Sequence, residues 1–168
     1  MNLFAKFKGD GATRPPRPTL RSILLGGVGG CIAIAVIGCL AKSTGLALVL
    51  GSFGASCVLV FGFPDLPFSQ PRHVVIGHCL SSFIGLALYQ LLGPSWSGMA
   101  LAAGCAIALM MATRTVHPPA GSNPVIIFLT GPSWRFLFFP TMAGALLLVV
   151  IALIFNNLVR PQRYPKYW

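Results

Sequence analysis

The chain has 168 residues, of which 55% are hydrophobic and only 8% are charged. A soluble domain of this size carries about 25% charged residues, and its surface is too large for so many apolar side chains to hide in one core, so the composition excludes a soluble globular fold. The formal charge is +10, but the basic residues stand at the ends of apolar runs and form no patch with aromatic side chains, which argues against a nucleic-acid partner.

A polar, basic and proline-rich segment covers residues 1–21, and we interpret it as a cytoplasmic tail. Apolar stretches able to cross a bilayer follow it. In chain order they are 22–41, 45–63, 74–92, 98–113, 118–134 and 136–158. The fifth is the weakest, and whether it crosses fully or is re-entrant stays open. Residues 159–168 form a second tail, so 22–158 is predicted to be a single transmembrane domain.

The placement of charge favours six crossings with both termini in the cytoplasm. With six spans, ten Lys and Arg residues lie on the cytoplasmic side, and only Lys42 and Arg135 lie on the other. If the fifth stretch did not cross, the split would be eight against four, so the positive-inside rule supports six spans. The predicted fold is therefore an all-α polytopic membrane protein. A bacterial inner (plasma) membrane is the expected location, because 21 residues are few for an organelle transit peptide.

Two halves of the chain resemble each other. Residues 30–34 are similar to 104–108, and residues 54–61 are similar to 120–128, in the same order. Such matches also arise by chance in apolar sequence. If they are real, the repeats are 22–94 and 98–158, and an odd number of spans in each inverts the second relative to the first. Inverted repeats are typical of channels and transporters, whose sites lie near the midplane.

The second span of each unit contains residues that interrupt a helix. One carries Gly51-Ser52-Phe53-Gly54-Ala55-Ser56, and the other carries His117-Pro118-Pro119-Ala120-Gly121-Ser122-Asn123-Pro124. Irregular backbone is tolerated in a membrane where protein or a water-filled path satisfies it. A half-helix beginning near Ser56 or Ser122 would direct free N–H groups at such a path and attract an anion. The alternative is a tight hinge packed by neighbouring helices.

Titratable side chains also favour an anion. No Asp or Glu lies in any span, whereas cation carriers and carboxylate proton relays need such residues there. Arg72 and Arg114 at the cytoplasmic mouth would draw an anion in, and His78 or His117 would gate it or protonate it. Packing histidines, and an arginine that anchors the helix end at the headgroups, are the alternatives.

The run Thr115-Val116-His117-Pro118-Pro119-Ala120-Gly121, preceded by Gln70-Pro71-Arg72 and a Gly-Ala-Ser element, resembles the HPP family of integral membrane proteins. The likeness extends from about residue 20 to residue 155. The resemblance implies a transporter-like protein, and plastid and cyanobacterial members are associated with nitrite transport. The chain departs from the family pattern at Ser122-Asn123-Pro124, where relatives often have Ala-Thr.

We therefore predict a channel or secondary transporter for a small inorganic anion, with nitrite as the leading candidate. The alternatives are a membrane scaffold without a solute path, or a membrane-embedded enzyme, for which three histidines and no intramembrane carboxylate are too few ligands. No catalytic residue, cofactor or metal site is expected, and the five cysteines are interpreted as packing residues. The expected partners are the bilayer, the anion and a second copy of the chain. The predicted pore residues are Gly54, Ala55, Ser56, Gln70, Arg72, His78, Arg114, His117, Pro118, Pro119, Ala120, Gly121, Ser122 and Asn123.

Overall fold

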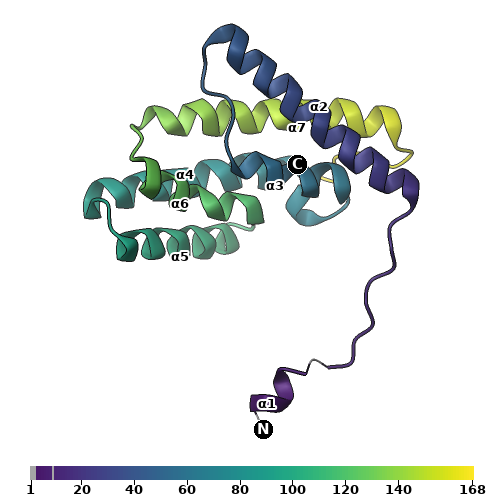
Figure 1. Cartoon of the computed structure of the whole chain (residues 1–168), viewed down its shortest axis with the longest axis horizontal. Coiled ribbons are helices and arrows are strands. Elements are labelled where there is room, and N and C mark those ends of the chain that lie inside the picture. Colours follow the sequence, from purple (N-terminus) through teal and green to yellow (C-terminus); the bar gives the residue numbers. More distant parts are fainter. Residues whose placement is uncertain (1–2, 9) are drawn as a thin grey trace.

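The computed structural model describes residues 3–8 and 10–168. A short helix, α1 (Leu3–Lys6), and the non-helical residues 10–19 lead away from the rest of the chain (Figure 1). The remaining residues form a bundle of helices, and the described part of the chain contains no β-strand. The predicted all-α membrane fold is confirmed at this level.

Four long helices frame the bundle: α2 (Leu20–Thr44), α4 (Pro71–Leu92), α5 (Trp96–Ala112) and α7 (Ala143–Val159). Their ends follow from local sequence. Thr19 caps α2 by accepting a hydrogen bond from the Ser22 N–H, and Gly45 ends it with φ of 69°, a conformation that glycine adopts without strain. Proline at the first position of α4 costs no hydrogen bond, because that N–H has no helical partner. A π-helical turn, η4 (Leu137–Met142), precedes α7.

The predicted second span is helical only in its second part. Residues 45–51 are not helical, and α3 (Ser52–Cys57) then continues directly as the π-helix η1 (Val58–Gly62). The expected break is confirmed, but the expectation that the half-helix begins near Ser56 is wrong. It begins at Ser52, because the glycines and serines of 51–56 tolerate helix once the chain has turned into the bundle.

The predicted fifth span is broken in its first part. The two prolines after His117 open a 3₁₀ helix, η3 (Pro118–Ser122), and α6 (Asn123–Thr130) follows it. The expected half-helix start near Ser122 is confirmed. Pro124 occupies the second position of α6, where its missing N–H leaves no gap in the helix.

The two half-helices begin at the same place and run in opposite directions along α4. At their starts, the Ser52 hydroxyl on α3 donates to Asn123 Oδ1 on α6 over 2.9 Å. From there η1 leads to the beginning of α4, where the Ser69 hydroxyl, in the 3₁₀ helix η2 (Pro67–Ser69), donates to Phe63 O over 2.7 Å. At the far end of α6, Trp134 Nε1 donates to Gln90 Oε1 near the end of α4.

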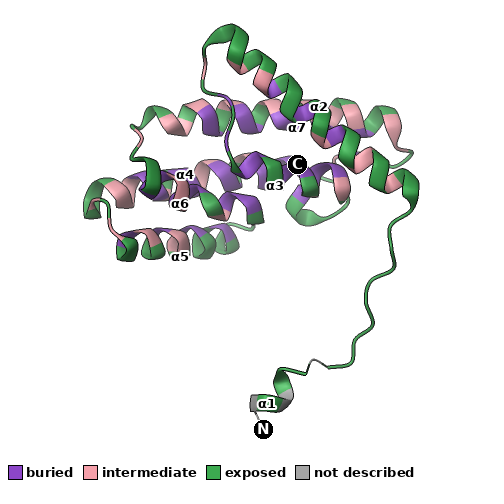
Figure 2. Cartoon of the chain, in the orientation of Figure 1, coloured by how far each residue is buried: buried purple, intermediate pink, exposed green. Residues whose placement is uncertain are grey.

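Buried residues concentrate where α3, α4 and α7 adjoin, whereas α2 is exposed along most of its length (Figure 2). The fully buried apolar side chains include Ala33, Ile37, Phe53, Val60, Phe61, Val74, Leu148 and Ala152. Large apolar side chains also cover the outer surface, among them Val28, Leu101, Ile107, Val150 and Ile154. A water-soluble protein does not expose so large an apolar area, whereas a bilayer covers it.

Three helical stretches are long and apolar enough to cross a membrane, namely α2, α4 and the combined η4 and α7. The 17-residue α5 is shorter, and 52–62 and 123–130 are half-helices. The number of complete crossings and the internal repeat therefore stay predictions. The beginning of α2 and the end of α7 lie at one end of the bundle, where Arg21 Nη2 donates to Val159 O over 3.0 Å.

Residues 115–121, called the HPP loop below, lie close to α4 at Gly77, which provides a test of the packing. A Cβ at Gly77 would lie 2.8 Å from His117 Cβ and 3.0 Å from Thr115 O. We expect Gly77→Ala to lower the free energy of unfolding by about 1–3 kcal/mol through overpacking, measured as a lower apparent melting temperature in detergent. The matched control is Gly104→Ala, because a Cβ there meets nothing within 4 Å. Equal melting temperatures for the two variants would contradict this packing.

Candidate functional site

A cluster of polar side chains is buried in the bundle where the two half-helices begin. Ser56 comes from α3, His78 from α4, His117 from the loop before η3 and Asn123 from the first position of α6. All four residues have 0% relative exposure. The cluster thus joins segments that are far apart in sequence. Ser56 comes from the first interrupted span, His117 and Asn123 come from the second, and His78 comes from α4.

Ser56 is the centre of this cluster. Its Oγ lies 3.0 Å from His78 Nε2 and 2.8 Å from His117 Nε2, so one hydroxyl joins the two imidazoles. The outer nitrogens of the two rings are also held. His117 Nδ1 lies 2.7 Å from Phe68 O, and His78 Nδ1 lies 3.1 Å from Asn123 Nδ2.

A second layer of hydroxyl groups satisfies the amide of Asn123. Its Oδ1 accepts from Ser52, and its Nδ2 donates to Ser82 Oγ over 2.9 Å. Ser82 in turn lies 3.0 Å from Thr141 Oγ1, which belongs to η4. In the described part of the chain, no buried side-chain nitrogen or oxygen lacks a hydrogen-bond partner. The polar atoms of the cluster are therefore satisfied within the protein, as a polar group in a bilayer requires.

The HPP loop is fixed by backbone contacts more than by its prolines. The Ser81 hydroxyl on α4 donates to Ala120 O over 2.6 Å, and the Ala120 N–H donates to His117 O. Pro119 is buried, whereas Pro118 is exposed and Gly121 is half-buried. The Ser122 hydroxyl donates to Pro119 O and is exposed, so it lies outside the cluster that Ser56 joins.

A basic pocket lies near the beginning of α4. It has a volume of about 360 Å³ and is lined by Arg72, His73, Arg114 and Tyr167. Within the described residues neither arginine forms an ion pair, and Arg114 adopts φ of 55°, which is unusual for a residue with a side chain. The sequence prediction placed both arginines at one mouth, and the structure brings them to one pocket.

The segment after α7 folds back over this end of the bundle. The Tyr164 hydroxyl donates to Ser69 O over 2.8 Å, and burial raises the pKa of Tyr164 above its ordinary value. The Lys166 N–H donates to Gln70 Oε1, and Lys166 Nζ forms an ion pair with Asp65 at 2.9 Å. Gln70, a predicted pore residue, is fully buried, and its side-chain amide donates to Pro64 O and Leu66 O in the loop before α4. Among the hydrogen bonds of the described residues, none joins Gln70 to the histidine cluster.

His73 connects the basic pocket to the HPP loop. Its Nδ1 lies 2.9 Å from Val116 O, the residue before His117, and its Nε2 lies 3.1 Å from the Tyr167 hydroxyl. The side chain is 8% exposed. It thus lies between the pocket and the loop that holds His117.

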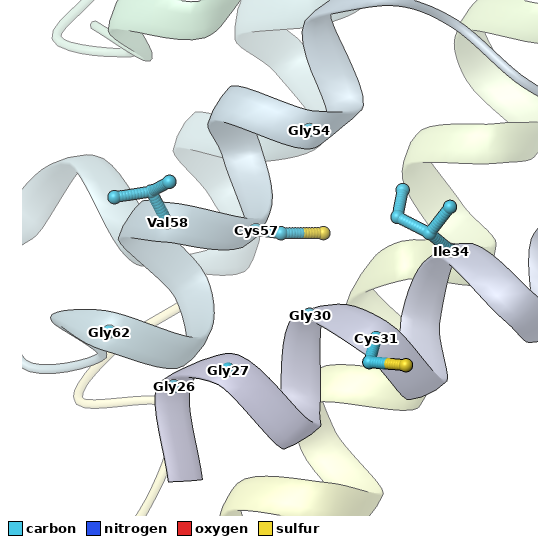
Figure 3. Close-up of a pocket in the computed structure, with 9 residues that line it drawn as sticks. All are labelled: Gly26, Gly27, Gly30, Cys31, Ile34, Gly54, Cys57, Val58 and Gly62. Carbon is cyan, nitrogen blue, oxygen red and sulfur yellow. The ribbon is translucent and has the colours of Figure 1, made fainter. Parts of the chain in front are cut away.

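A separate apolar groove of about 390 Å³ separates α2 from α3 and η1 (Figure 3). Gly26, Gly30, Gly54 and Gly62 line it, together with Cys57 and other residues. Gly26 and Gly30, which are four residues apart on α2, therefore lie across this groove from η1 of the same chain. Gly54 and its exposed neighbour Ala55 were predicted to line the pore, and this stays a prediction. In the structure Gly54 lines this groove.

Several residues of the site were not in the predicted set. Ser52, Ser82 and Thr141 complete the hydrogen bonds of Asn123, and His73 and Tyr167 line the basic pocket. Ser82 lies one helical turn from His78, and this spacing was a usable signal. Nothing local in the sequence marks Thr141 or Tyr167, because their partners are 59 and 94 residues away.

The sequence is similar to a known family and to curated proteins. A family model described as the HPP transmembrane region matches residues 15–165. Two Dictyostelium discoideum proteins, both described as transmembrane proteins, match this chain. Each is 36% identical to it over an alignment that covers 98% of this chain. The chain covers 62% and 57% of their lengths, so it spans about three fifths of the curated relatives it matches. No solved structure matches the chain.

Replacement of Ser56 tests the cluster as a structural unit. Ser56→Ala leaves two buried imidazole nitrogens without a partner, and each such group costs about 1–3 kcal/mol. We expect a clearly lower melting temperature in detergent. Ser122→Ala removes an exposed hydroxyl with a single backbone contact, so it is the control and should change the melting temperature little. A Ser56→Ala protein as stable as the control would show that the two bonds add nothing.

Proposed function

Because this chain belongs to the HPP family of membrane proteins, we propose that it is a channel or secondary transporter for a small inorganic anion, with nitrite as the leading candidate. The observation that carries the proposal is the meeting of two broken helices at the buried cluster of Ser56, His78, His117 and Asn123. Interrupted helices that meet inside a membrane bundle are the usual frame of a solute site.

The chemistry of the described spans suits an anion. The two acidic residues of the chain, Asp10 and Asp65, are exposed and lie outside the helices. The cluster offers hydroxyl, amide and imidazole N–H donors, and no carboxylate lies among its hydrogen-bond partners in the described residues. Donors without a competing negative charge favour an anion over a cation.

The proposed route begins at the basic pocket. Arg72 and Arg114 attract the anion, since their charges are not neutralised by an ion pair within the described residues. His73 and the segment 114–117 then link the pocket to His117. At the cluster the path is closed, so passage requires Ser56 to separate from at least one imidazole. Channel and carrier both fit this route.

The charge distribution supports the proposed orientation. Arg21, Arg72, Arg114 and Arg160 lie at the end of the bundle that also holds the beginning of α2 and the end of α7. The positive-inside rule makes this the cytoplasmic end, with both termini on that side. A bacterial inner membrane and a homo-oligomer, which the small size of the chain favours, complete the proposal.

A membrane scaffold without a solute path is the second candidate, and one observation favours it. The cluster is fully buried and every polar atom in it is paired. A permanently closed network would hold the two half-helices together and nothing more. The two candidates differ in one measurable property, which is flux.

The first test is nitrite uptake into liposomes that contain the purified protein, with nitrate, formate and chloride as comparators, at pH 6 and pH 8. We expect saturable and selective nitrite uptake that His117→Ala reduces to the level of empty liposomes, because the variant removes one of the two imidazoles that Ser56 joins at the proposed site. Empty liposomes correct for nitrous acid that crosses the lipid unaided. Absence of flux from a folded protein would support the scaffold instead.

The second test addresses the basic pocket. Arg72→Gln and Arg114→Gln each remove a charge from the pocket lining, and we expect several-fold slower uptake at low salt, with the difference shrinking as salt screens the field. Arg163→Gln is the matched control, because Arg163 is exposed in the C-terminal segment and does not line the pocket. Equal slowing by all three substitutions would indicate a general effect of net charge.

A further inference from the structure

We propose that the buried cluster binds one proton, that His117 is the residue that takes it, and that the Ser56 hydroxyl turns to the Ser52 carbonyl when it does. This inference deepens the proposed function, and only its consequence for transport rests on that function. The argument follows from which atoms of the cluster can donate and which can only accept.

Asn123 fixes the state of His78. Backbone carbonyls accept and never donate, and Asn123 Nδ2 lies 3.3 Å from His78 O. The amide nitrogen therefore faces α4, while Oδ1 accepts from Ser52 on the other side. Nδ2 also faces His78 Nδ1 at 3.1 Å, and its two hydrogens are shared among this ring nitrogen, His78 O and Ser82 Oγ. Because Nδ2 offers no acceptor to an N–H on the ring, His78 Nδ1 is the unprotonated nitrogen. The neutral His78 then carries its hydrogen on Nε2 and donates it to Ser56 Oγ.

Phe68 fixes the state of His117 from the other end. Its carbonyl oxygen can only accept, so His117 Nδ1 carries a hydrogen and donates it over 2.7 Å. The neutral His117 therefore has a free lone pair on Nε2, which accepts from the Ser56 hydroxyl at 2.8 Å. The hydrogen bonds run in one direction, from Asn123 through His78 and Ser56 to His117 and Phe68.

Ser56 has an alternative acceptor, which allows one proton to enter. Its Oγ lies 3.2 Å from Ser52 O. If a proton from solution binds His117 Nε2, that nitrogen becomes a donor to Ser56 Oγ, and the hydroxyl hydrogen turns to Ser52 O. Oγ then accepts from both imidazoles and donates once, which its two lone pairs and one hydrogen permit. No other group of the cluster has to move.

His78 has no such alternative. A proton on its Nδ1 would point at the amide hydrogens of Asn123, and the amide cannot turn without placing its oxygen against His78 O. Two imidazolium rings would also repel strongly, since the ring centroids are 5.0 Å apart. Asn123 is therefore a positioning residue that keeps His78 neutral and directs the proton to His117.

The surroundings contain few competing groups. On α3, Cys57 lines the glycine groove, and on α4, Cys79 lines a different apolar groove beside η4. The segments η3, α6 and η4 carry no titratable side chain. On the side of the basic pocket, His73, Arg72 and Arg114 face the loop that holds His117. His73 Nδ1 lies 2.9 Å from Val116 O, and its Nε2 lies 3.1 Å from the Tyr167 hydroxyl.

A proton on His117 would give the membrane interior a single positive charge beside the Ser56 hydroxyl. An anion would then be favoured at the cluster only while the proton is present, so anion and proton would cross together. In this scheme acid increases the flux because it fills His117 Nε2, and one proton accompanies each anion.

The direct test is ¹⁵N NMR of histidine-labelled protein in lipid, and it does not depend on transport. The chain has three histidines, and His73→Gln with His78→Gln assigns them. At pH 8 we expect the Nε2–H tautomer for His78 and the Nδ1–H tautomer for His117. Acidification should convert His117 to imidazolium while His78 keeps its tautomer. An Nδ1–H tautomer for His78, or protonation of His78 before His117, would overturn the proposal.

Asn123→Asp provides a second variant with the opposite expectation. A carboxylate at this position accepts from His78 Nδ1, so His78 should change tautomer or become imidazolium at a pH where the wild-type ring is neutral. An unchanged His78 signal in the folded variant would contradict the positioning role of Asn123. Ser122 is next to Asn123 but is exposed and lies outside the cluster. The control Ser122→Ala should therefore leave the signals of all three histidines unchanged.

The transport arm separates this inference from the proposed function. Nitrite uptake and internal pH are recorded together in liposomes, with empty liposomes subtracted. Nitrite flux with one proton per anion supports both. Nitrite flux with no proton movement overturns the inferred coupling of proton and anion and leaves the function standing. Absence of flux, with the expected tautomers, removes the anion function and keeps the proton assignment.

Discussion

The rest of the structure depends on the rule that a polar group inside a bilayer must find its partner within the protein. Ser56, His78, His117 and Asn123 obey it together, since no one of them could be buried at this depth alone. Their mutual bonds define where the two half-helices begin. The position of these bonds also explains the non-helical segment before α3 and the 3₁₀ helix before α6, because each segment must place a polar side chain at the same point.

The central helix α4 provides the surface on which this arrangement is built. Gly77 allows the HPP loop to approach α4, and Gly85 allows α6 to do the same, with a Cβ there lying 3.0 Å from Pro124 Cα. Between them, Ser81 and Ser82 bind the Ala120 carbonyl and the Asn123 amide. Small residues for close approach and hydroxyls for backbone contacts are the usual means of packing helices in lipid, where no hydrophobic force draws them together.

Much of the frame could be predicted from the sequence, because apolar length and helix-breaking residues act locally. The all-α fold, the two interrupted spans and the start of α6 beside Ser122 were predictable for this reason. The start of α3 at Ser52 was not, since glycine and serine permit several starts and tertiary contacts select one. The pairing of Ser56 with both histidines, and the brace of Gln70 by Lys166, join residues 22 to 96 positions apart, which no local pattern specifies.

A closed cluster is compatible with a transport path because hydrogen bonds are strong individually but small in net free energy. Each contributes about 0.5–1.5 kcal/mol when its partners can bind something else instead. An anion that arrives with its own acceptor oxygens offers the Ser56 hydroxyl and the imidazole N–H groups such replacements. Opening would then be costly only in the absence of a ligand. The bonds that hold the half-helices together would therefore also select a solute that can replace them.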